Sequence, residues 1–300
     1  MLWVEPSAAC NLDCEGCPTA AGRGGGVMGY RDFARIIDRT PWLKLVNLWY
    51  RGEPLAAAEL PEMVAEATRR SVRSQTHSNG ILLGRGDLAQ RLVEAGLTRI
   101  TIGIDGPDEE TYRNVRQGGT LAEVEAGVRT LVEARQKRRS RQPRIIAECL
   151  LSRQTSGQLR RVRETALAWG CDVVRFKTYR VPDIDDLEHA VSLLPDDPGL
   201  WRYQRRDGRL VMKRSRQSCR RLAYSALVAW NGDVYPCCFD VTGEYTMGNL
   251  LREPLPDIWR GERFTEFRRR VRNSRNGIPM CRNCTEGLPR LYIPHKTVLR

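Results

Sequence analysis

Three cysteines near the start of the sequence have the spacing of a metal-binding loop. Cys10, Cys14 and Cys17 form a Cys-x3-Cys-x2-Cys motif directly after a short apolar run. Three thiolates on one loop can bind three corners of a [4Fe–4S] cluster, which leaves one iron free for an exogenous ligand. A structural zinc loop is the alternative, but zinc usually takes four protein ligands, and neither a histidine nor a fourth cysteine lies nearby. The motif therefore favours a cluster that can act on a bound molecule.

Four cysteines in the last third of the sequence could form a second metal site. Cys219 and Cys237 lie on either side of a predicted hairpin, and Cys281 and Cys284 form a Cys-x2-Cys pair. Four thiolates can hold either a [4Fe–4S] cluster or a zinc ion, and the spacing alone leaves both open. The sequence has no secretory signal, so its cysteines indicate metal ligands or reactive thiols in a cytoplasmic protein rather than disulfides.

The elements that must position these cysteines follow a repeating pattern. Up to residue 185, short apolar runs alternate with helical periodicity, which is typical of repeated βα units and a parallel sheet. Six such units predict an α/β fold, a partial (β/α)6 TIM-like barrel whose functional residues gather at the C-terminal ends of the strands. The predicted strands are 2–6, 45–50, 74–78, 99–104, 144–151 and 173–178, and the predicted helices are 32–38, 61–70, 88–95, 121–134 and 157–169.

A change of pattern after residue 185 predicts a second unit. Residues 186–216 combine Pro and Asp residues with a basic run, and we interpret them as a linker. Asn231-Gly232 between two apolar runs then predicts a β-hairpin, because both residues tolerate positive φ. The sequence thus predicts a barrel domain over 1–185, a linker over 186–216 and a small C-terminal domain, a hairpin plus a helix, over 217–300.

The formal net charge of +13 comes almost entirely from arginines spread along the sequence. The densest basic runs, 136–141 and 268–270, lie beside helical periodicity and contain no aromatic residues that could stack on bases. We interpret them as solvated helix faces, with attraction of an anionic substrate or a reducing protein partner as the alternative, and expect no nucleic acid. No apolar run of about 18 residues predicts a membrane span.

The cysteine loop after the first predicted strand resembles that of the radical S-adenosylmethionine (SAM) superfamily. The second predicted strand is followed by Arg51-Gly52-Glu53-Pro54, similar to the Gly-Gly-Glu-Pro motif with which this family receives the methionine ammonium group of SAM. Arg51 replaces the first glycine, so the resemblance assigns only Gly52, Glu53 and Pro54 to SAM. It also implies that the loop cysteines hold a [4Fe–4S] cluster that cleaves SAM.

The turns after the third and fourth predicted strands extend this resemblance. Ser78 and Asn79 match a family turn that lies near SAM. Asp105 belongs to a sequence similar to the family's Ser-x-Asp-Gly, with Gly103 in place of the serine. Arg116 corresponds to a family arginine near the methionine carboxylate, and a surface salt bridge is the alternative for this residue.

The C-terminal cysteines resemble the auxiliary-cluster domains called SPASM and, in a shorter form, twitch. A full SPASM domain holds two auxiliary clusters and needs more cysteines than this sequence has left. The resemblance therefore implies a twitch domain in which Cys219, Cys237, Cys281 and Cys284 hold a single [4Fe–4S] cluster. The implied cofactors are two [4Fe–4S] clusters and SAM.

The resemblance implies an enzyme that cleaves SAM reductively to a 5′-deoxyadenosyl radical and abstracts a hydrogen atom from a substrate carbon. Twitch proteins of this size resemble dehydrogenases and epimerases of sugars and aminocyclitols. We therefore expect oxidation or epimerisation of such a small molecule, with electrons from a flavodoxin or a ferredoxin-like protein. A peptide-modifying maturase is the alternative, although the first predicted strand starts at residue 2 and we expect no N-terminal domain for a leader peptide. A non-catalytic metal-binding or electron-transfer scaffold would not need an open iron beside SAM-binding turns.

Two cysteines outside both ligand sets could donate a hydrogen atom to a substrate radical. Cys149 lies on the fifth predicted strand, and Cys238 follows Cys237. Most free thiols are inert core residues, which is our interpretation of Cys171, but a thiol facing the radical site can return hydrogen in an epimerisation. Glu148 and Lys177, charged residues within apolar strands, could contact cofactor or substrate at the mouth of the barrel.

Overall fold

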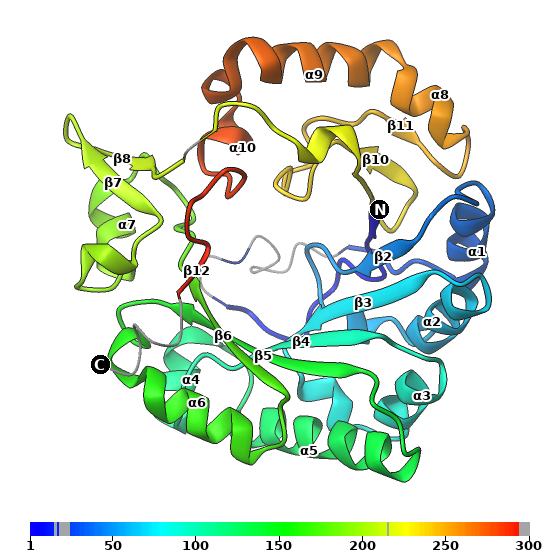
Figure 1. The fold of residues 1–300 in the computed structure, drawn as a ribbon, viewed down its shortest axis with the longest axis vertical. Helices are drawn as coiled ribbons and strands as arrows, with labels where there is room; N and C mark the ends of the chain where they lie inside the picture. Colours follow the sequence, from blue (N-terminus) through cyan, green and yellow to red (C-terminus); the bar gives the residue numbers. More distant parts are fainter. Residues whose placement is uncertain (15–16, 18–24, 215, 294–300) are drawn as a thin grey trace.

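Six neighbouring parallel strands form the centre of the molecule (Figure 1). The computed structural model describes residues 1–14, 17, 25–214 and 216–293. These strands are β1 (Leu2–Val4), β2 (Leu45–Leu48), β3 (Arg73–Ser78), β4 (Arg99–Gly103), β5 (Arg144–Leu151) and β6 (Val173–Thr178), and they follow one another in chain order across the sheet. The predicted partial barrel is therefore confirmed, and the C-terminal ends of all six strands lie at the same edge.

Helices cover the outer face of this sheet because each has an apolar stripe to bury. In α1, for example, Phe33, Ile36 and Ile37 are buried at helical spacing. The outer helices are α1 (Tyr30–Asp38), α2 (Leu60–Arg69), α3 (Leu88–Glu94), α5 (Leu121–Lys137) and α6 (Leu159–Ala168). A short helix that the sequence analysis missed, α4 (Glu109–Val115), begins after Asp108, whose side chain accepts a hydrogen bond from the Thr111 N–H.

The C-terminal part of the chain extends the same sheet at both edges. Strand β9 (Ala226–Val228) pairs parallel with β1 and continues into β10 (Asp233–Tyr235) and β11 (Gly248–Asn249), while β12 (Tyr292–Ile293) pairs antiparallel with β6. Ten of the described strands thus belong to one sheet. Helices α8 (Leu255–Arg260), α9 (Glu262–Ser274) and α10 (Pro279–Arg282) complete this part, and Phe264 and Phe267 of α9 belong to the same buried cluster as the barrel strands.

The predicted hairpin between β9 and β10 is present, but its turn differs from the prediction. The Ala229 N–H donates to the Asp233 carbonyl at 2.8 Å, and only Gly232 adopts a positive φ, of 87°. The side-chain oxygen of Asn231 instead accepts a hydrogen bond from the Asp233 N–H at 3.1 Å. The turn therefore needs glycine at one position, with asparagine stabilising it through its side chain.

The segment interpreted as a linker carries its own secondary structure. It contains α7 (Leu187–Leu193) and a hairpin of β7 (Tyr203–Arg206) and β8 (Arg209–Met212), joined by Asp207-Gly208 with both residues at positive φ. Asp-Gly is a strong two-residue hairpin signal that the sequence analysis overlooked. The segment buries a small cluster that includes Ala190, Trp201 and Tyr203.

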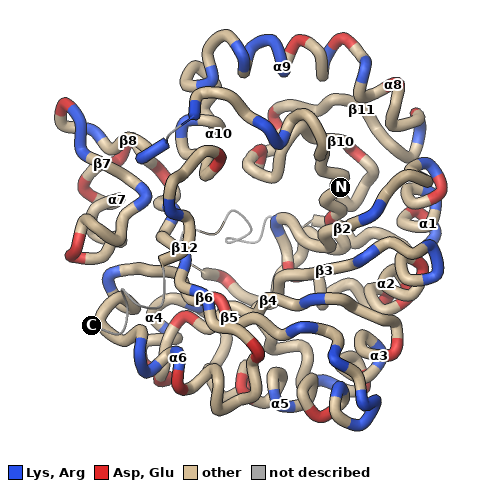
Figure 2. The backbone as a smooth tube through the Cα atoms, viewed as in Figure 1, with Lys and Arg blue, Asp and Glu red and all other residues tan. Residues whose placement is uncertain are grey.

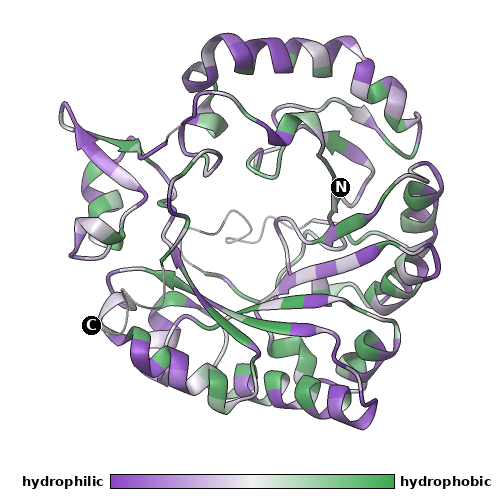
Figure 3. Ribbon diagram, viewed as in Figure 1, coloured by the Kyte–Doolittle hydropathy of each residue, from purple (hydrophilic) through white to green (hydrophobic). Residues whose placement is uncertain are grey.

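Charge and hydropathy follow the architecture. Figure 2 shows Lys and Arg residues along most of the chain with Asp and Glu residues among them, and Figure 3 shows hydrophilic and hydrophobic residues alternating along the outer helices. On α9, Arg269 pairs with Glu266 at 2.6 Å. This pattern fits solvated helix faces. Within the described ranges, no helix has the length and apolar character needed to cross a membrane.

Candidate functional site

The loop after β1 brings Cys10, Cys14 and Cys17 together. Cys14 is buried and the other two are half-buried. The Cys17 N–H donates to the Cys14 carbonyl at 3.1 Å, and the Leu12 N–H donates to the Cys10 sulfur at 3.5 Å. Burial raises the pKa of Cys10, and the negative charges of Glu53 and the two neighbouring thiols raise it further. Thiols bind metal as thiolates, and three neighbouring thiolates repel one another. A bound metal cation would stabilise them, so the loop fits a metal site.

Glu53 lies beside this loop because Gly52 allows the two backbones to touch. A Cβ on Gly52 would lie 2.4 Å from the Ser7 carbonyl oxygen, and the Glu53 N–H donates to the Ala9 carbonyl at 2.8 Å. The sequence motif therefore has a steric reason for its glycine.

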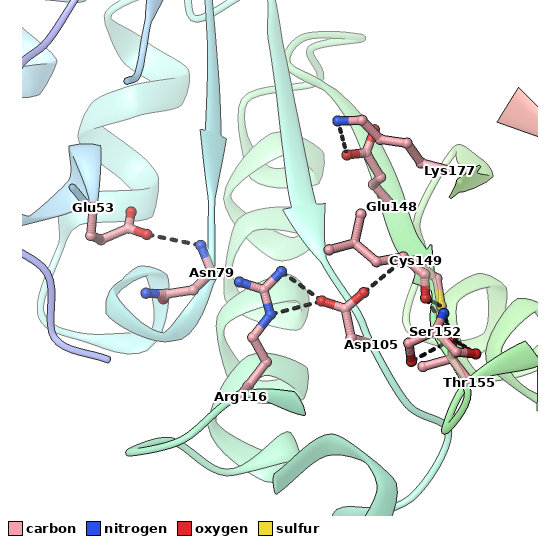
Figure 4. A network of polar contacts seen from close by, with 10 residues as sticks. Glu53, Asn79, Asp105, Arg116, Glu148, Cys149, Ser152, Thr155 and Lys177 are labelled. Atoms are coloured by element: carbon pink, nitrogen blue, oxygen red, sulfur yellow. Dashed lines mark hydrogen bonds and ion pairs between the residues drawn. The ribbon is translucent and has the colours of Figure 1, made fainter. Parts of the chain in front are cut away.

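The carboxylate of Glu53 is buried and accepts two backbone hydrogen bonds. They come from the Leu55 N–H at 3.0 Å and the Asn79 N–H at 2.9 Å, the second of which Figure 4 shows. Burial raises its pKa, and it forms no ion pair with any described residue. A buried carboxylate of this kind fits an incoming ammonium group such as that of SAM.

The turn after β3 connects Glu53 to the cysteine loop. The Asn79 side chain donates to Asn11 at 2.8 Å and accepts from the Ile81 N–H at 3.0 Å. The Ser78 hydroxyl accepts from the Gly80 N–H at 2.9 Å, in a turn where Gly80 has a φ of 86°. Ser78 and Asn79 therefore lie where a molecule bound between Glu53 and the cysteines would meet them.

Asp105 and Arg116 form a buried pair at the end of β4. Arg116 Nε and Nη2 lie 2.7 and 2.6 Å from one Asp105 oxygen, and the other oxygen accepts from the Leu150 N–H at 2.6 Å (Figure 4). Arg116 also hydrogen-bonds Cys14. The surface salt bridge considered for Arg116 does not describe it, because its side chain is 22% exposed and that of Asp105 is fully buried. Both oxygens of Asp105 are used within the protein, so we interpret Asp105 as a positioning residue for Arg116.

Gly103 explains one departure from the family motif. A Cβ at this position would lie 2.5 Å from Arg116 Nη2. A serine here would therefore displace the guanidinium from its present position, and glycine leaves room for it.

A buried arginine, Arg275, contacts one cysteine of the second set. Cys281 and Cys284 are buried, and Cys219 and Cys237 are half-buried. Arg275 is 3% exposed and donates to the Cys284 sulfur at 3.3 Å and to the Ser218 carbonyl at 3.2 Å. It forms no ion pair with a carboxylate among the residues described. Thiolates bound to a metal would supply the negative charge that this cation lacks, so these residues fit the implied cluster.

The donor arrangement also bears on the choice between iron–sulfur and zinc. In the described part of the chain, no three His, Cys, Asp or Glu side chains converge as they would around one metal ion. In a four-iron cluster each thiolate binds a different iron, which spreads the ligands further apart than around a single zinc ion. The donor spacing is therefore compatible with a four-iron cluster.

One cavity of about 520 Å³ is lined by two cysteines of the first set and by residues adjacent in the chain to two cysteines of the second set. Cys14, Cys17 and Arg116 line it on the side of the first set, and Cys238 and Thr285 line it beside the second. Since Cys238 follows Cys237 and Thr285 follows Cys284, a molecule in this cavity would lie next to both sites.

Glu148 and Lys177 meet at this cavity, as the sequence analysis suggested. Lys177 Nζ lies 3.0 Å from Glu148, and the Tyr292 hydroxyl donates to the other oxygen at 3.1 Å (Figure 4 shows the first pair). Burial disfavours the charged carboxylate, but Lys177 and His77 outweigh it, and the pKa of Glu148 is lowered. Lys177 lines the cavity, and Glu148 neutralises the charge of Lys177.

The two candidate hydrogen donors have different surroundings. Cys149 is 1% exposed, hydrogen-bonds Thr155 and is not among the residues lining the cavity, whereas Cys238 lines it and accepts a hydrogen bond from Arg221 at 3.2 Å. Cys238 also shares a hydrogen bond with Cys237, which lowers the pKa of Cys238 to about 6. Of the two thiols, only Cys238 has direct access to a molecule in the cavity.

Three arginines at the cavity, Arg180, Arg202 and Arg221, were missed by the sequence analysis. Arg180 follows β6 directly, and the tendency of functional residues to follow barrel strands could have identified it. Arg202 lies in the segment interpreted as a linker, where no sequence signal marks it.

Comparison with known proteins assigns both parts of the chain. The profile of the radical SAM superfamily matches residues 4–142, and that of SPASM, an iron–sulfur cluster-binding domain, matches residues 219–285. A Pyrococcus furiosus protein described as a tungsten-containing aldehyde ferredoxin oxidoreductase cofactor-modifying protein is 25% identical, over 95% of this chain and 86% of the relative. Several other curated relatives are matched over less than half of their own length.

Solved structures share the fold at low sequence identity. BtrN in complex with AdoMet and 2-DOIA has a TM-score of 0.55 at 19% identity, with 95% of this chain and 92% of that chain covered. SuiB of Streptococcus suis bound to precursor peptide SuiA has a TM-score of 0.63 at 13% identity, with 89% and 66% covered.

Proposed function

This chain belongs to the radical SAM superfamily and carries an auxiliary iron–sulfur domain, and on that premise we propose that it oxidises a small molecule at an unactivated carbon. The substrate is sugar- or cyclitol-like and occupies the cavity between the two cysteine sets. The electron donor is a flavodoxin or a ferredoxin-like protein.

The proposed roles of the residues follow from their positions. Cys10, Cys14 and Cys17 hold the cluster that, when bound, supplies the electron for reductive cleavage of SAM to methionine and a 5′-deoxyadenosyl radical. Glu53 binds the methionine ammonium group and Arg116 its carboxylate, each through a charge-assisted hydrogen bond. Gly52, Pro54, Ser78 and Asn79 shape the rest of the SAM site, and Asp105 positions Arg116.

The shared cavity is the observation that carries this proposal. Its volume of about 520 Å³ lies in the range of small-molecule sites. A substrate there could lose a hydrogen atom on the side of Cys14 and Cys17 and pass an electron toward Cys219, Cys237, Cys281 and Cys284.

The oxidation balances when two hydrogens leave the substrate. The carbon gives up a hydrogen atom, the substrate hydroxyl gives up a proton to form a carbonyl group, and the remaining electron would be accepted by a cluster that Cys219, Cys237, Cys281 and Cys284 would hold. Epimerisation is the second candidate, because Cys238 lines the same cavity and a thiol there could return a hydrogen atom to the opposite face of the carbon.

The test is turnover in deuterated water with anaerobically reconstituted protein. We expect substrate-dependent formation of 5′-deoxyadenosine and a product that has lost two hydrogen atoms, and deuterium placed on the reacting carbon should appear in 5′-deoxyadenosine. A product that instead gains one deuterium from solvent would overturn the oxidation and support epimerisation. In that case Cys238→Ala should still give 5′-deoxyadenosine but no inverted product.

A peptide substrate is the alternative within this family. A screen that finds turnover with a peptide and none with sugar- or cyclitol-like molecules would replace the proposed substrate class.

A further inference from the structure

The cavity between the two cysteine sets has a strongly cationic wall. Of its described lining residues, five are basic and none is Asp or Glu; the basic ones are Arg116, Lys177, Arg180, Arg202 and Arg221. The net charge that a substrate meets in this cavity depends on how many of these cations are already paired with anionic groups of the protein.

Three of the five cations have anionic or sulfur partners. Arg116 pairs with Asp105 at 2.6 Å, and Lys177 pairs with Glu148 at 3.0 Å. Arg221 donates to the Cys238 sulfur and lies 4.0 Å from a carboxylate oxygen of Glu286. These three add little net charge to the cavity.

Arg180 and Arg202 form no ion pair with a carboxylate and no hydrogen bond with a cysteine sulfur among the residues that the structure describes, and Glu148 and Cys284 act on Arg202 only through longer-range electrostatics. Arg202 is 2% exposed, its Nη2 donates to the Thr178 carbonyl, and its Nε has no partner. The Arg180 guanidinium lies 4.9 Å from the centroid of the Phe239 ring, and its buried Nε also lacks a partner.

Two uncompensated neighbouring cations, Arg202 buried and Arg180 half-buried, are costly. A buried charge loses hydration, and only an opposite charge or several hydrogen bonds restore what it loses. Burial lowers the pKa of Arg202 to about 10, and repulsion from Arg180 adds to this effect. One carbonyl and one aromatic ring do not balance the pair, whereas an anion in the cavity would.

We infer that Arg180 and Arg202 bind an oxyanion group of the substrate, a carboxylate or a phosphate. The inference rests on the proposed function, because it assigns this anion to the molecule that occupies the shared cavity. Guanidinium groups bind both oxyanions through paired charge-assisted hydrogen bonds. An aminocyclitol with ammonium groups, which the sequence analysis included, would meet like charges here, so an acidic or phosphorylated sugar- or cyclitol-like molecule fits better.

The test measures anion binding without turnover. Protein with both clusters and saturating SAM is titrated with inorganic phosphate and, separately, with acetate, against chloride at equal ionic strength. We expect one oxyanion to bind and to raise the thermal midpoint, and the stronger of the two identifies phosphate or carboxylate. Arg202→Met and Arg180→Gln should each weaken that binding at least about tenfold, because each removes a charge-assisted contact.

A matched control and a stability measurement separate binding from structure. Arg205→Gln changes an exposed arginine of β7, the strand that begins directly after Arg202, and this arginine does not line the cavity, so the variant should bind the anion like the unaltered protein. Without added oxyanion, Arg202→Met should be at least as stable as the unaltered protein, because it removes an uncompensated buried charge. A purely structural arginine would instead make this variant less stable.

The inference is overturned if phosphate and acetate bind no better than chloride, or if the Arg180 and Arg202 variants bind them as the unaltered protein does. Neither result would affect the SAM chemistry, since 5′-deoxyadenosine formation is measured separately. Conversely, failure to form 5′-deoxyadenosine would reject the proposed function and leave the anion measurement valid.

Discussion

Glu53 is a buried carboxylate beside the first cysteine loop, stabilised by backbone N–H groups and by no described ion pair. A buried carboxylate without a cationic partner has lost its hydration, which costs free energy. A bound ammonium group would offset that cost and would therefore bind more tightly. The same reasoning at Arg202 leads to an anion. In each case the charge of the buried side chain predicts the opposite charge on the ligand group that binds it.

Replacing Glu53 with Gln should weaken SAM binding by about 10- to 100-fold, the range for losing a charged hydrogen bond. Iron content should not change, because Glu53 is not a proposed ligand. Equilibrium binding of SAM to anaerobically reconstituted protein measures the affinity. Glu66→Gln, which removes a buried carboxylate from α2 that already pairs with Arg70, is the control and should bind SAM normally. Normal SAM affinity in Glu53→Gln would show that the ammonium site lies elsewhere.

At the level of elements, Arg51 connects the end of β2 to the end of β1 and to the turn between β9 and β10. Its Nε and Nη2 each lie 3.1 Å from an oxygen of Glu5, and the Trp230 N–H donates to the same carboxylate at 3.3 Å. Glu5 is fully buried. Where the family motif has glycine, this chain thus has the cation that neutralises a carboxylate between its two halves.

Arg51→Gly should destabilise the protein by about 3 kcal/mol, because it leaves the buried Glu5 charge without its cation. Urea unfolding measures the loss. Adding Glu5→Gln to this variant should recover part of it, since no buried charge then remains. If Arg51→Gly unfolds at the same urea concentration as the unaltered protein, Glu5 has another source of compensation.

The local elements could be predicted from sequence, whereas the long-range ones could not. Strands β1, β2 and β5 are mostly apolar runs because parallel strands are buried on both faces, and that pattern is visible in the sequence, whereas β3 is polar. The pairing of Leu2 with Ala226 joins distant residues and leaves no local pattern. The same holds for Arg202, whose burial depends on where α7 and the β7–β8 hairpin pack. The cysteine sets were predictable because spacing within a loop is itself local.

The whole molecule is arranged so that one sheet connects both cysteine sets. Pairing of β9 with β1 and of β12 with β6 holds the C-terminal part at both edges of the barrel sheet. The cavity therefore lies beside Cys14 and Cys17 of the first set and beside the chain neighbours of Cys237 and Cys284 in the second, as the proposed oxidation requires. The proposed oxidation requires two clusters in one chain. The assignment of individual cysteines to each cluster stays a prediction.

Metal content tests that requirement. Anaerobically reconstituted protein should contain roughly eight irons and eight sulfides per chain, as expected for two four-iron clusters. Changing Cys10, Cys14 and Cys17 to Ala should leave about half of the iron and abolish SAM cleavage. Changing Cys281 and Cys284 to Ala should also leave about half but retain SAM binding, because the first cluster stays intact. Cys171→Ala, at a buried cysteine assigned to neither set, should keep the full content. Stoichiometric zinc beside about four irons would show that the second set holds zinc, and the proposed oxidation would then lack its electron acceptor.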